Sequence, residues 1–390
     1  MAMVRYSRGT KKLFLSSKRT VALRSKMLLG AIRHYPVFRP LVDHSVYRED
    51  NRRLGCTFRK RAKIIHSISW PARIPNNIPP GALIEFEHPF ALVGHLDEQT
   101  DYVSFRQNLH SLLQNFLAWF HHGQHRLIGC TNGAVRSLLA LFHDSYSQYL
   151  SESVELLRWG IPKYRHRITP PKNKLNVFHY GGPYPYAKGT HDVLAAARRL
   201  LSVDFHVVAD LTHPLFRTPP PVNVRLYPFE NKRQYDLALF QSHLLIYPIY
   251  ADGWGVILDA LSAALPIIIY DSYDKDEAVI HDKTGMLVRL PKQLSFYDDF
   301  ARGEYRNWTE YNTMIADCFS QERANTLASF VENYARDKNM LIEHSWQTSL
   351  LHDRHHDPRR RIHRIHQIYE NIIRYLDGEL TPTASLSSGS

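Results

Sequence analysis

The sequence predicts an α/β protein with two doubly wound parallel sheets. Three observations favour this class. Short β-type runs alternate with helix-like segments along most of the chain, the pattern restarts with a buried strand near residue 175, and a basic, proline-containing interval without apolar periodicity, 160–174, separates the two halves. A chain of 390 residues is long enough for two domains of ordinary size, each with its own core.

The amino-acid composition indicates the broad class of protein. The apolar fraction of 44% is normal for a globular chain, and no apolar run approaches the roughly 20 residues that span a bilayer. The basic N-terminus lacks a continuous apolar core and a small-residue cleavage site, so it is a poor secretory signal. Cys56, Cys130 and Cys318 lie far apart, which indicates neither a disulfide framework nor a thiolate zinc cluster. We therefore expect a cytoplasmic protein.

The net charge of +12 and the sequence pI near 9.5 imply an anionic partner, such as nucleic acid, an anionic membrane face or a diphosphate substrate. Basic clusters occur at Lys11-Lys12, at 59–61 and at 359–361. The simplest explanation is that these clusters form a positively charged surface in contact with water. The alternative is that they attract the protein to the anionic inner face of a membrane. The chain lacks a helix-turn-helix, zinc-finger or aromatic-basic RNA signature, so we expect no specific nucleic-acid partner.

In the first half of the chain, secondary structure can be predicted from residue 63 onward. Residues 1 to about 60 show only helical patches around 18–34. The second predicted strand ends in Glu87-His88-Pro89, and Thr131-Asn132-Gly133 is a cap signal for a helix. The predicted elements are strands at 63–67, 82–86, 126–130 and 155–159, with helices at 102–121 and 134–142.

The second half repeats the pattern and then becomes helical. Gly181-Gly182 follows its first strand, a glycine-punctuated loop at 252–255 follows a later one, and Pro266 ends the helix after that loop. The predicted elements are strands at 175–180, 205–209, 222–227, 244–247 and 267–270, with helices at 190–201, 232–241, 256–264, 311–319, 324–334 and 358–376. The tail from 380 is rich in Ser, Thr, Pro and Gly, which indicates disorder.

Two of these loops have the composition of anion sites. In a parallel α/β sheet, a loop at the carboxyl end of a strand lies beside a helix N-terminus, where unbonded backbone N–H groups favour a phosphate or a polar sugar. The loop 181–188 carries two glycines and Lys188, and the stretch 252–259 carries Asp252 and Asp259. We expect the tips of these loops to converge on a shared anion pocket.

The stretch 242–288 resembles the nucleotide-sugar site of GT-B retaining glycosyltransferases of family 4, which reads Pro-Ser-x-x-Glu-Gly-Phe-Gly, then Glu-Ala, then Gly-x-Pro-Val-Ile. The matching positions, in order, are Pro248, Asp252-Gly253-Trp254-Gly255, Asp259-Ala260 and Leu265-Pro266-Ile267. His344-Ser345-Trp346 and Tyr369 look like the family's Phe-Ser-Trp and the Tyr of its last helix.

The resemblance implies a GT-B fold, in which two Rossmann-like domains face a central cleft and the C-terminal helix crosses back onto the first domain. The expected parts are an acceptor-side domain at 1–162, a nucleotide-sugar-binding domain at 173–345, a helical segment at 346–378 that packs back on the first domain, and a disordered tail at 379–390.

The resemblance also implies roles for single residues. Lys188 looks like the Lys of a Gly-Arg...Lys-Gly loop that holds the diphosphate, and Gly181 and Gly182 look like the start of that loop. Asp252 would face the donor sugar together with the backbone N–H groups of Gly253, Trp254 and Gly255. Asp259 would accept hydrogen bonds from the ribose. On the acceptor side, His88 at a strand end would contact a sugar hydroxyl near the scissile bond. The expected catalytic residues are Asp252, His88 and Lys188.

The function implied is transfer of a hexose from a nucleoside diphosphate sugar to a hydroxyl of a glycan or lipid-linked acceptor, with retention of configuration. The nucleotide sugar is a co-substrate, and we expect no cofactor. We also expect no metal, because no Cys or grouped carboxylate completes a ligand set in the His-rich tracts. The protein would work in the cytoplasm, with peripheral attachment to the inner membrane face as an added expectation.

Departures from the family pattern favour an alternative. Both family glutamates are aspartates here, six residues separate Asp252 from Asp259 where the family has seven, and Pro183 stands at the Arg position. A catalytically inactive relative that serves as a binding or scaffold subunit fits these changes. A third hypothesis, motivated by the charge alone, is weak, salt-sensitive binding of nucleic acid without sequence preference.

Overall fold

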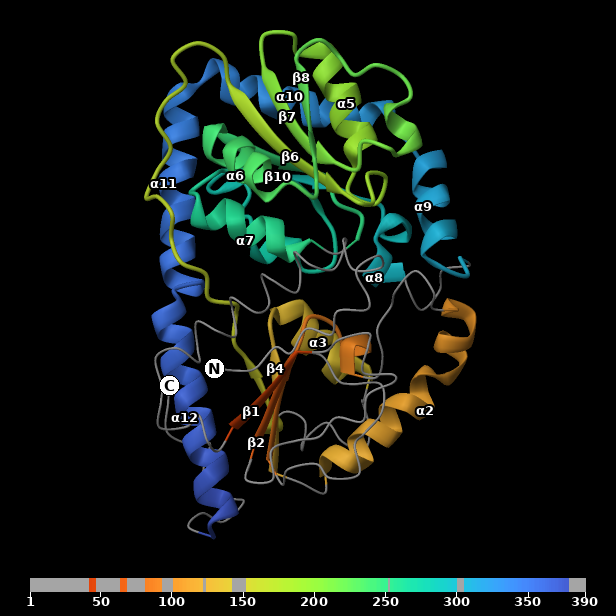
Figure 1. The fold of residues 1–390 in the computed structure, drawn as a ribbon, viewed down its shortest axis with the longest axis vertical. Coiled ribbons are helices and arrows are strands. Elements are labelled where there is room, and N and C mark those ends of the chain that lie inside the picture. Colours follow the sequence, from red (N-terminus) through yellow and green to blue (C-terminus); the bar gives the residue numbers. More distant parts are fainter. Residues whose placement is uncertain are drawn as a thin grey trace. The chain divides into compact units, whose positions relative to one another are not determined.

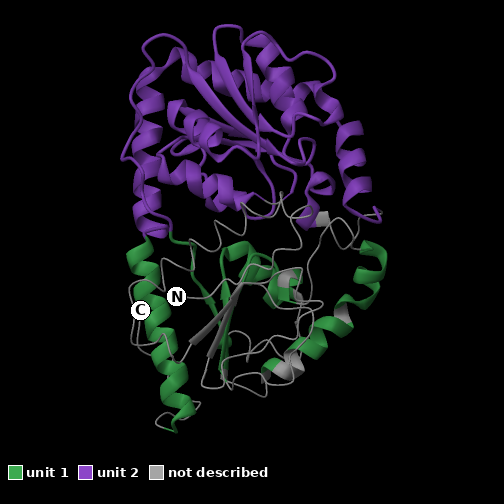
Figure 2. Ribbon diagram, viewed as in Figure 1, with its two compact units in different colours: residues 1–11, 19–160, 358–390 green, residues 12–18, 161–357 purple. Residues whose placement is uncertain are grey.

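A computed structural model describes residues 42–46, 64–68, 81–92, 101–121, 124–141, 152–251, 253–299 and 305–378 (Figure 1). The chain divides into two compact units (Figure 2). Unit 1 comprises Met1–Lys11, Arg19–Gly160 and Pro358–Ser390, and unit 2 comprises Lys12–Lys18 and Ile161–Asp357. Residues 346–357, which we predicted to accompany the last helix, therefore belong to unit 2.

The sheet of unit 1 has five parallel strands in the order β1-β2-β3-β4-β5. The strands are β1 (Val42–Val46), β2 (Ile64–Ile68), β3 (Gly81–Phe86), β4 (Gln124–Gly129) and β5 (Val154–Leu156). β2, β3 and β4 confirm predicted strands with small shifts of their ends. β5 ends at Leu156 rather than at Trp159, and β1 was not predicted, because its stretch has no clear periodicity.

Different helices cover the two faces of this sheet. Side chains alternate along β3, so Ala82, Ile84 and Phe86 share one face and Leu83 lies on the other. The first face packs against α2 (Tyr102–His121) and α3 (Asn132–Leu141), and a short 3₁₀ helix, η2, spans Pro89–Leu92. The second face packs against α12 (Pro358–Leu376), the last helix of the chain. A segment from the far end of the sequence therefore completes the core of unit 1.

Polar contacts fasten α12 to the sheet. Arg361 Nη2 lies 2.5 Å from Glu85 Oε1, with both side chains buried. Arg361 Nη1 also donates to the carbonyls of Leu157 at 2.6 Å and Arg158 at 2.7 Å. A second, partly exposed pair joins Arg364 to Glu155. Burial of the first pair is favourable only because several hydrogen bonds satisfy the guanidinium.

The sheet of unit 2 has six parallel strands in the order β11-β10-β9-β6-β7-β8. The strands are β6 (Asn176–Gly182), β7 (Asp204–Ala209), β8 (Val224–Pro228), β9 (Leu244–Tyr247), β10 (Ile267–Asp271) and β11 (Gly285–Arg289). Successive strands extend the sheet in one direction from β6 and in the opposite direction from β9, which is the doubly wound order. β11 was not predicted; the other five strands were.

Helices flank both sides of this sheet, with α5 and α10 together on one side and α6 and α7 on the other (Figure 1). The helices are α5 (Thr190–Arg199), α6 (Lys232–Gln241), α7 (Trp254–Ser262), α8 (Phe296–Asp299), α9 (Trp308–Asp317), α10 (Gln321–Arg336) and α11 (Lys338–His355). Three 3₁₀ helices connect them at Pro214–Phe216 (η3), Lys275–Glu277 (η4) and Lys292–Leu294 (η5). None of the helices in the described ranges combines the length and the apolar character needed to cross a membrane.

Helix α11 was predicted only from residue 346 onward, as part of the helical segment 346–378, because its buried face is largely polar. Ser345 Oγ donates to the carbonyl of Ala264 at 2.7 Å and accepts from the N–H of Ile168 at 2.9 Å. Thr348 and His352 bond buried carbonyls in the same way. These side chains occupy positions where hydrophobic residues would produce a recognisable helical pattern.

Candidate functional site

The carboxyl ends of β6 and β9 lie side by side at the point where the strand order of unit 2 reverses. The loop after β6 leads into α5, and the loop after β9 leads into α7. Open α/β sheets bind ligands at such a point, because helix N-termini present unbonded N–H groups there. The candidate site is built on the described residues of these two loops, 183–189 and 248–251 with Gly253.

The two loops touch each other. The N–H of Tyr250 donates to the carbonyl of Ala187 at 3.0 Å, and Lys188 Nζ donates to the carbonyl of Ala251 at 3.1 Å. Gly189 has a φ of +68°, and a Cβ at this position would lie only 2.0 Å from the carbonyl oxygen of Pro248. The structure therefore brings together the loops that we expected to converge, while the anion pocket remains a prediction.

The glycines and the lysine of the first loop are buried. Gly181 packs so closely on the first turn of α5 that a Cβ would lie 2.4 Å from Thr190 Oγ1. Gly182 has a φ of +54°, in the region that favours glycine. Lys188 is only 8% exposed. Its ammonium group is held against the second loop, so a bound anion would have to share or replace the contact with Ala251.

The second loop and α7 hold the other predicted residues. Gly253 is the N-cap of α7, and Gly255 is partly exposed. Trp254 is buried, its Nε1 donates to Asp274 Oδ2 at 3.0 Å, and Lys275 Nζ lies 5.4 Å from the centroid of its ring. The Trp254 side chain thus packs inside unit 2. Of this predicted group, the backbone N–H groups are the part suited to face a ligand.

Asp259 makes an internal contact that the sequence did not predict. It is 8% exposed, and its Oδ2 accepts the hydroxyl hydrogen of Tyr235 at 2.7 Å. A ribose would therefore have to use the remaining capacity of this carboxylate. Lys232, at the start of α6, is exposed and pairs with Asp236 at 2.5 Å, so it is not directed to this site.

The structure does not place the other two predicted catalytic residues within this group. Asp252 lies outside the described residues. His88 belongs to unit 1, where it follows β3, is partly exposed and has its ring centroid 5.5 Å from that of Phe90. The residues that the structure groups in unit 2 are Gly181, Gly182, Lys188, Gly253, Trp254, Gly255 and Asp259.

His179 is a residue that the sequence reasoning missed. Its Nδ1 lies 2.9 Å from the carbonyl oxygen of Ile246 in β9, and its Nε2 lies 2.8 Å from Thr190 Oγ1 in α5. Because a carbonyl can only accept, Nδ1 carries the hydrogen and Nε2 accepts from the hydroxyl. Complete burial lowers the pKa of His179 to about 4, so the ring is neutral at pH 7. It joins β6, β9 and the start of α5.

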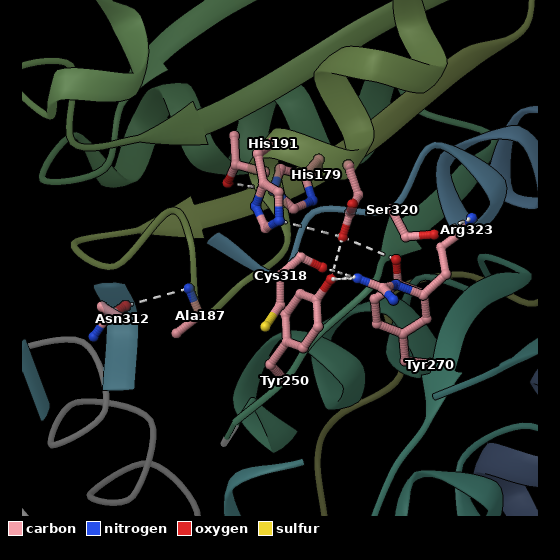
Figure 3. A network of polar contacts seen from close by, with 11 residues as sticks. His179, Ala187, His191, Tyr250, Tyr270, Asn312, Cys318, Ser320 and Arg323 are labelled. Atoms are coloured by element: carbon pink, nitrogen blue, oxygen red, sulfur yellow. Dashed lines mark hydrogen bonds and ion pairs between the residues drawn. The ribbon is translucent and has the colours of Figure 1, made fainter. Parts of the chain in front are cut away.

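A second missed group surrounds Asp192 in the first turn of α5. Tyr250 and Tyr270 donate their hydroxyl hydrogens to Asp192 Oδ2 at 2.5 and 2.9 Å, and Arg323 Nη2 lies 3.3 Å from the Tyr250 hydroxyl (Figure 3). Burial, with the Asp192 charge as a further cause, raises the pKa of both tyrosines. Burial lowers the pKa of His191, against the pull of Asp192. This network connects the first turn of α5 to Tyr250 in the loop after β9 and to Tyr270 in β10.

The arrangement suits a phosphate-bearing ligand. Lys188 supplies a cation, and the N-termini of α5 and α7 supply backbone donors at the same edge of the sheet. Such groups can neutralise a diphosphate without a metal. In the described part of the chain, no group of three or more His, Cys, Asp or Glu side chains could hold a metal ion.

No family model and no curated protein matches this sequence. Solved structures do match its fold. The glycosyltransferase from Rickettsia africae ESF-5 has a TM-score of 0.50 at 11% identity, covering 95% of this chain and 84% of that protein. HepE of Anabaena, solved in complex with UDP, has a TM-score of 0.52 at 14% identity, covering 80% and 93%.

TarM of S. aureus has a TM-score of 0.50 at 12% identity, covering 78% of this chain and 54% of TarM. The chain thus spans about half the length of TarM. At these identities the likeness concerns the fold, which is the GT-B arrangement of two Rossmann-like domains expected from the sequence.

Proposed function

We propose that this protein is a glycosyltransferase that moves a hexose from a nucleoside diphosphate sugar to a hydroxyl of a glycan or lipid-linked acceptor, with retention of configuration. One observation carries the proposal most directly. The reversal of strand order in unit 2 places a glycine-lysine loop and two helix N-termini at one sheet edge, and the motif of the second loop resembles a nucleotide-sugar site.

In this proposal, the leaving diphosphate is stabilised by Lys188 and by the N–H groups at the start of α5 and α7. Gly253 and Gly255 keep side chains away from the donor, so its oxygens can approach the backbone. Asp252 faces the donor sugar, and Asp259 shares its carboxylate between Tyr235 and the ribose. The HepE structure with UDP supports a uridine nucleotide as the first donor to test.

Retention follows from the resemblance to family 4. The departing diphosphate would itself help to remove the proton from the incoming hydroxyl on the same face of the sugar, so no side-chain nucleophile is required. His88, at the carboxyl end of β3, would donate a hydrogen bond to a sugar hydroxyl. We propose that the reaction needs no metal, and that basic surface residues attract the protein to an anionic membrane where its acceptor is lipid-linked.

Donor binding and Lys188 provide the test. We expect UDP to raise the melting temperature of the wild-type protein, because a ligand that binds only the folded state stabilises it. Lys188→Ala should weaken UDP binding by about tenfold or more, since it removes a charge-assisted contact. Lys174→Ala is the matched control. Lys174 also donates to a backbone carbonyl, that of Leu201 at 3.3 Å, but it precedes β6 and so lies at the opposite edge of the sheet.

Two results would contradict this assignment. One is UDP binding that Lys188→Ala and Lys174→Ala weaken equally. The other is the absence of any shift with UDP, GDP or ADP and their sugars. Transfer should also survive a chelator, and loss of transfer in EDTA that Mg²⁺ restores would overturn the metal-independent proposal.

A catalytically inactive binding protein is the second candidate. It is favoured by Lys188, whose ammonium group bonds the carbonyl of Ala251, and by Asp259, which accepts the Tyr235 hydroxyl. This candidate predicts donor binding without turnover. Hydrolysis or transfer of a UDP-sugar by the wild-type protein, lost in Asp252→Ala, would exclude it.

A further inference from the structure

The carboxylate of Asp192 is completely buried in the first turn of α5, three residues after the end of the loop that carries Lys188. Burial of a carboxylate is unfavourable unless hydrogen bonds compensate for the lost water. Here both donors within hydrogen-bond distance are tyrosine hydroxyls, and both bond the same oxygen, Oδ2. His191 Nε2 is the nearest basic group, at 3.7 Å. The arrangement is therefore specific to these two tyrosines.

The two tyrosines differ in their place in the fold. Tyr270 lies in the interior of β10, where strand pairing with β9 and β11 already fixes its backbone. Tyr250 lies in the loop after β9, outside any strand or helix. Its N–H bonds Ala187 of the first loop at 3.0 Å, and its carbonyl accepts from Phe296 N at 2.9 Å and from the Tyr311 hydroxyl at 3.0 Å.

The side-chain bond from Tyr250 to Asp192 thus links the second loop to the helix that begins at the first loop. In Figure 3 the side chains of Tyr250, Tyr270 and Arg323 meet at this network, and Asn312 separately holds the N–H of Ala187. The Ala251 carbonyl that receives Lys188 follows Tyr250 directly. Any shift of Tyr250 would therefore move the acceptor of the Lys188 ammonium.

We propose that Asp192 is a positioning residue that, through Tyr250, fixes residues 248–251 against the loop 183–189 and so sets how tightly the site holds a diphosphate. The inference rests on the proposed nucleotide-sugar function for the ligand. The alternative is that Asp192 only stabilises the core of unit 2. The two tyrosines separate these explanations, because both bond the same oxygen and only one belongs to a site loop.

The experiment compares Tyr250→Phe with Tyr270→Phe in the full chain. Each variant removes one hydroxyl from Asp192 Oδ2 and keeps the buried ring. We expect Tyr250→Phe to weaken UDP binding about tenfold and to speed amide hydrogen exchange at residue 250 by a similar factor. Tyr270→Phe should change both quantities by about twofold or less, although it lowers the melting temperature comparably.

A conservative replacement at the carboxylate adds a second comparison. Asp192→Asn keeps an oxygen that can accept both hydroxyls, with its amide nitrogen in the place of Oδ1, which has no hydrogen-bond partner in the structure. We expect Asp192→Asn to bind UDP within about threefold of wild type, whereas Asp192→Leu should bind at least about tenfold more weakly. Equal binding by the two variants would overturn the proposal.

The exchange measurement needs no ligand, so it decides the positioning role independently. Equal exchange rates at residue 250 in Tyr250→Phe and Tyr270→Phe would overturn the role of Asp192, even if the wild-type protein binds UDP normally. Conversely, a wild-type protein that binds no nucleotide would refute the proposed function. Faster exchange in Tyr250→Phe alone would then still support Asp192 as the residue that fixes this loop.

Discussion

The two sheets bury polar groups in different places. In unit 1, the buried pair of Glu85 and Arg361 lies where β3 meets α12, and it fastens a helix to the sheet. In unit 2, His179 joins β6 and β9 to the start of α5, and Asp192 joins α5 to Tyr250 in the loop after β9 and to Tyr270 in β10. Both arrangements are costly to desolvate, and their positions indicate what each one holds.

The place of a buried polar group indicates whether it holds two packed elements together or positions a loop. A polar group that only joins two packed elements could be replaced by a hydrophobic side chain of similar shape. A polar network that reaches from a helix to a site loop instead fixes the loop, as a binding site requires.

Loss of the buried ion pair should be the most destabilising change. Arg361→Ala leaves Glu85 buried without its guanidinium partner and should lower the free energy of unfolding by about 4 kcal/mol. Arg364→Ala breaks the partly exposed pair with Glu155 and should cost less than about 1 kcal/mol. Denaturant unfolding with a probe in unit 1 measures both.

A double replacement sharpens the contrast between the units. Glu85→Leu combined with Arg361→Met removes both charges and should be more stable than either single variant, because hydrophobic side chains can fill the same space. If the double variant is the least stable of the three, hydrophobic side chains cannot replace the ion pair. The contrast drawn between the two units would then be wrong.

The contact between the site loops should be nearly as sensitive. Gly189→Ala forces a residue with a Cβ to a φ of +68° and against the carbonyl of Pro248, so it should lower the free energy of unfolding by about 3 kcal/mol. Gly378→Ala is the matched control. Its φ is +78° with no atom within 4 Å of the new Cβ, so only the backbone term of about 1 kcal/mol applies. Equal effects would show that the loops separate easily.

The sequence predicted most elements of both units where hydrophobic periodicity is strong. β9 and α12 occur at the predicted residues, since a short apolar run ends at Pro248 and isoleucines recur at helical spacing in 358–376. α11 was only partly predicted, from residue 346 onward, because His344, Ser345 and Thr348 lie on its buried face. β11 is a short strand that follows a loop without a clear boundary, and β1 lies in a stretch with no clear pattern.

The site was predictable only where local signals mark it. Glycines and turn residues located the loops after β6 and β9, and the structure places those loops in contact. His179 and Asp192 gave no such signal. The tyrosines that bond Asp192 lie 58 and 78 residues further along the chain, and only the sheet order brings them together. A motif also could not show that Asp259 already accepts a hydroxyl from Tyr235.

Lowering the pH should reduce the free energy of unfolding of unit 2, because His179 is buried there as a neutral ring. Burial lowers the pKa of this ring to about 4, so between pH 6.5 and pH 4 the unfolded chain takes up a proton that the folded protein does not. Stability contributed by the neutral ring is complete above pH 6.5 and is lost as the pH falls. The expected contribution is a loss of about 2 kcal/mol on going from pH 7.5 to pH 5.

Unfolding of His179→Gln at both pH values checks this contribution. The variant should be less stable at pH 7.5 but should lose about 2 kcal/mol less than wild type on acidification. His206, whose pKa is also lowered to about 4 mainly by burial, adds a loss of the same sign that the His179 variant retains. An unchanged pH slope in His179→Gln would mean that another group controls the acid sensitivity of unit 2.

The smallest expected effect concerns Trp254, which joins the second loop to the 3₁₀ helix after β10. Trp254→Phe removes the Nε1 donor to Asp274 and keeps an aromatic face for Lys275. Asp274 remains paired with Lys275, so the loss should be about 1 kcal/mol rather than the larger penalty of an unpaired buried charge. Lys275→Met removes that pairing and should be several times more destabilising. If the two variants unfold at the same denaturant concentration, the indole hydrogen bond to Asp274 fixes the loop as strongly as the ion pair does.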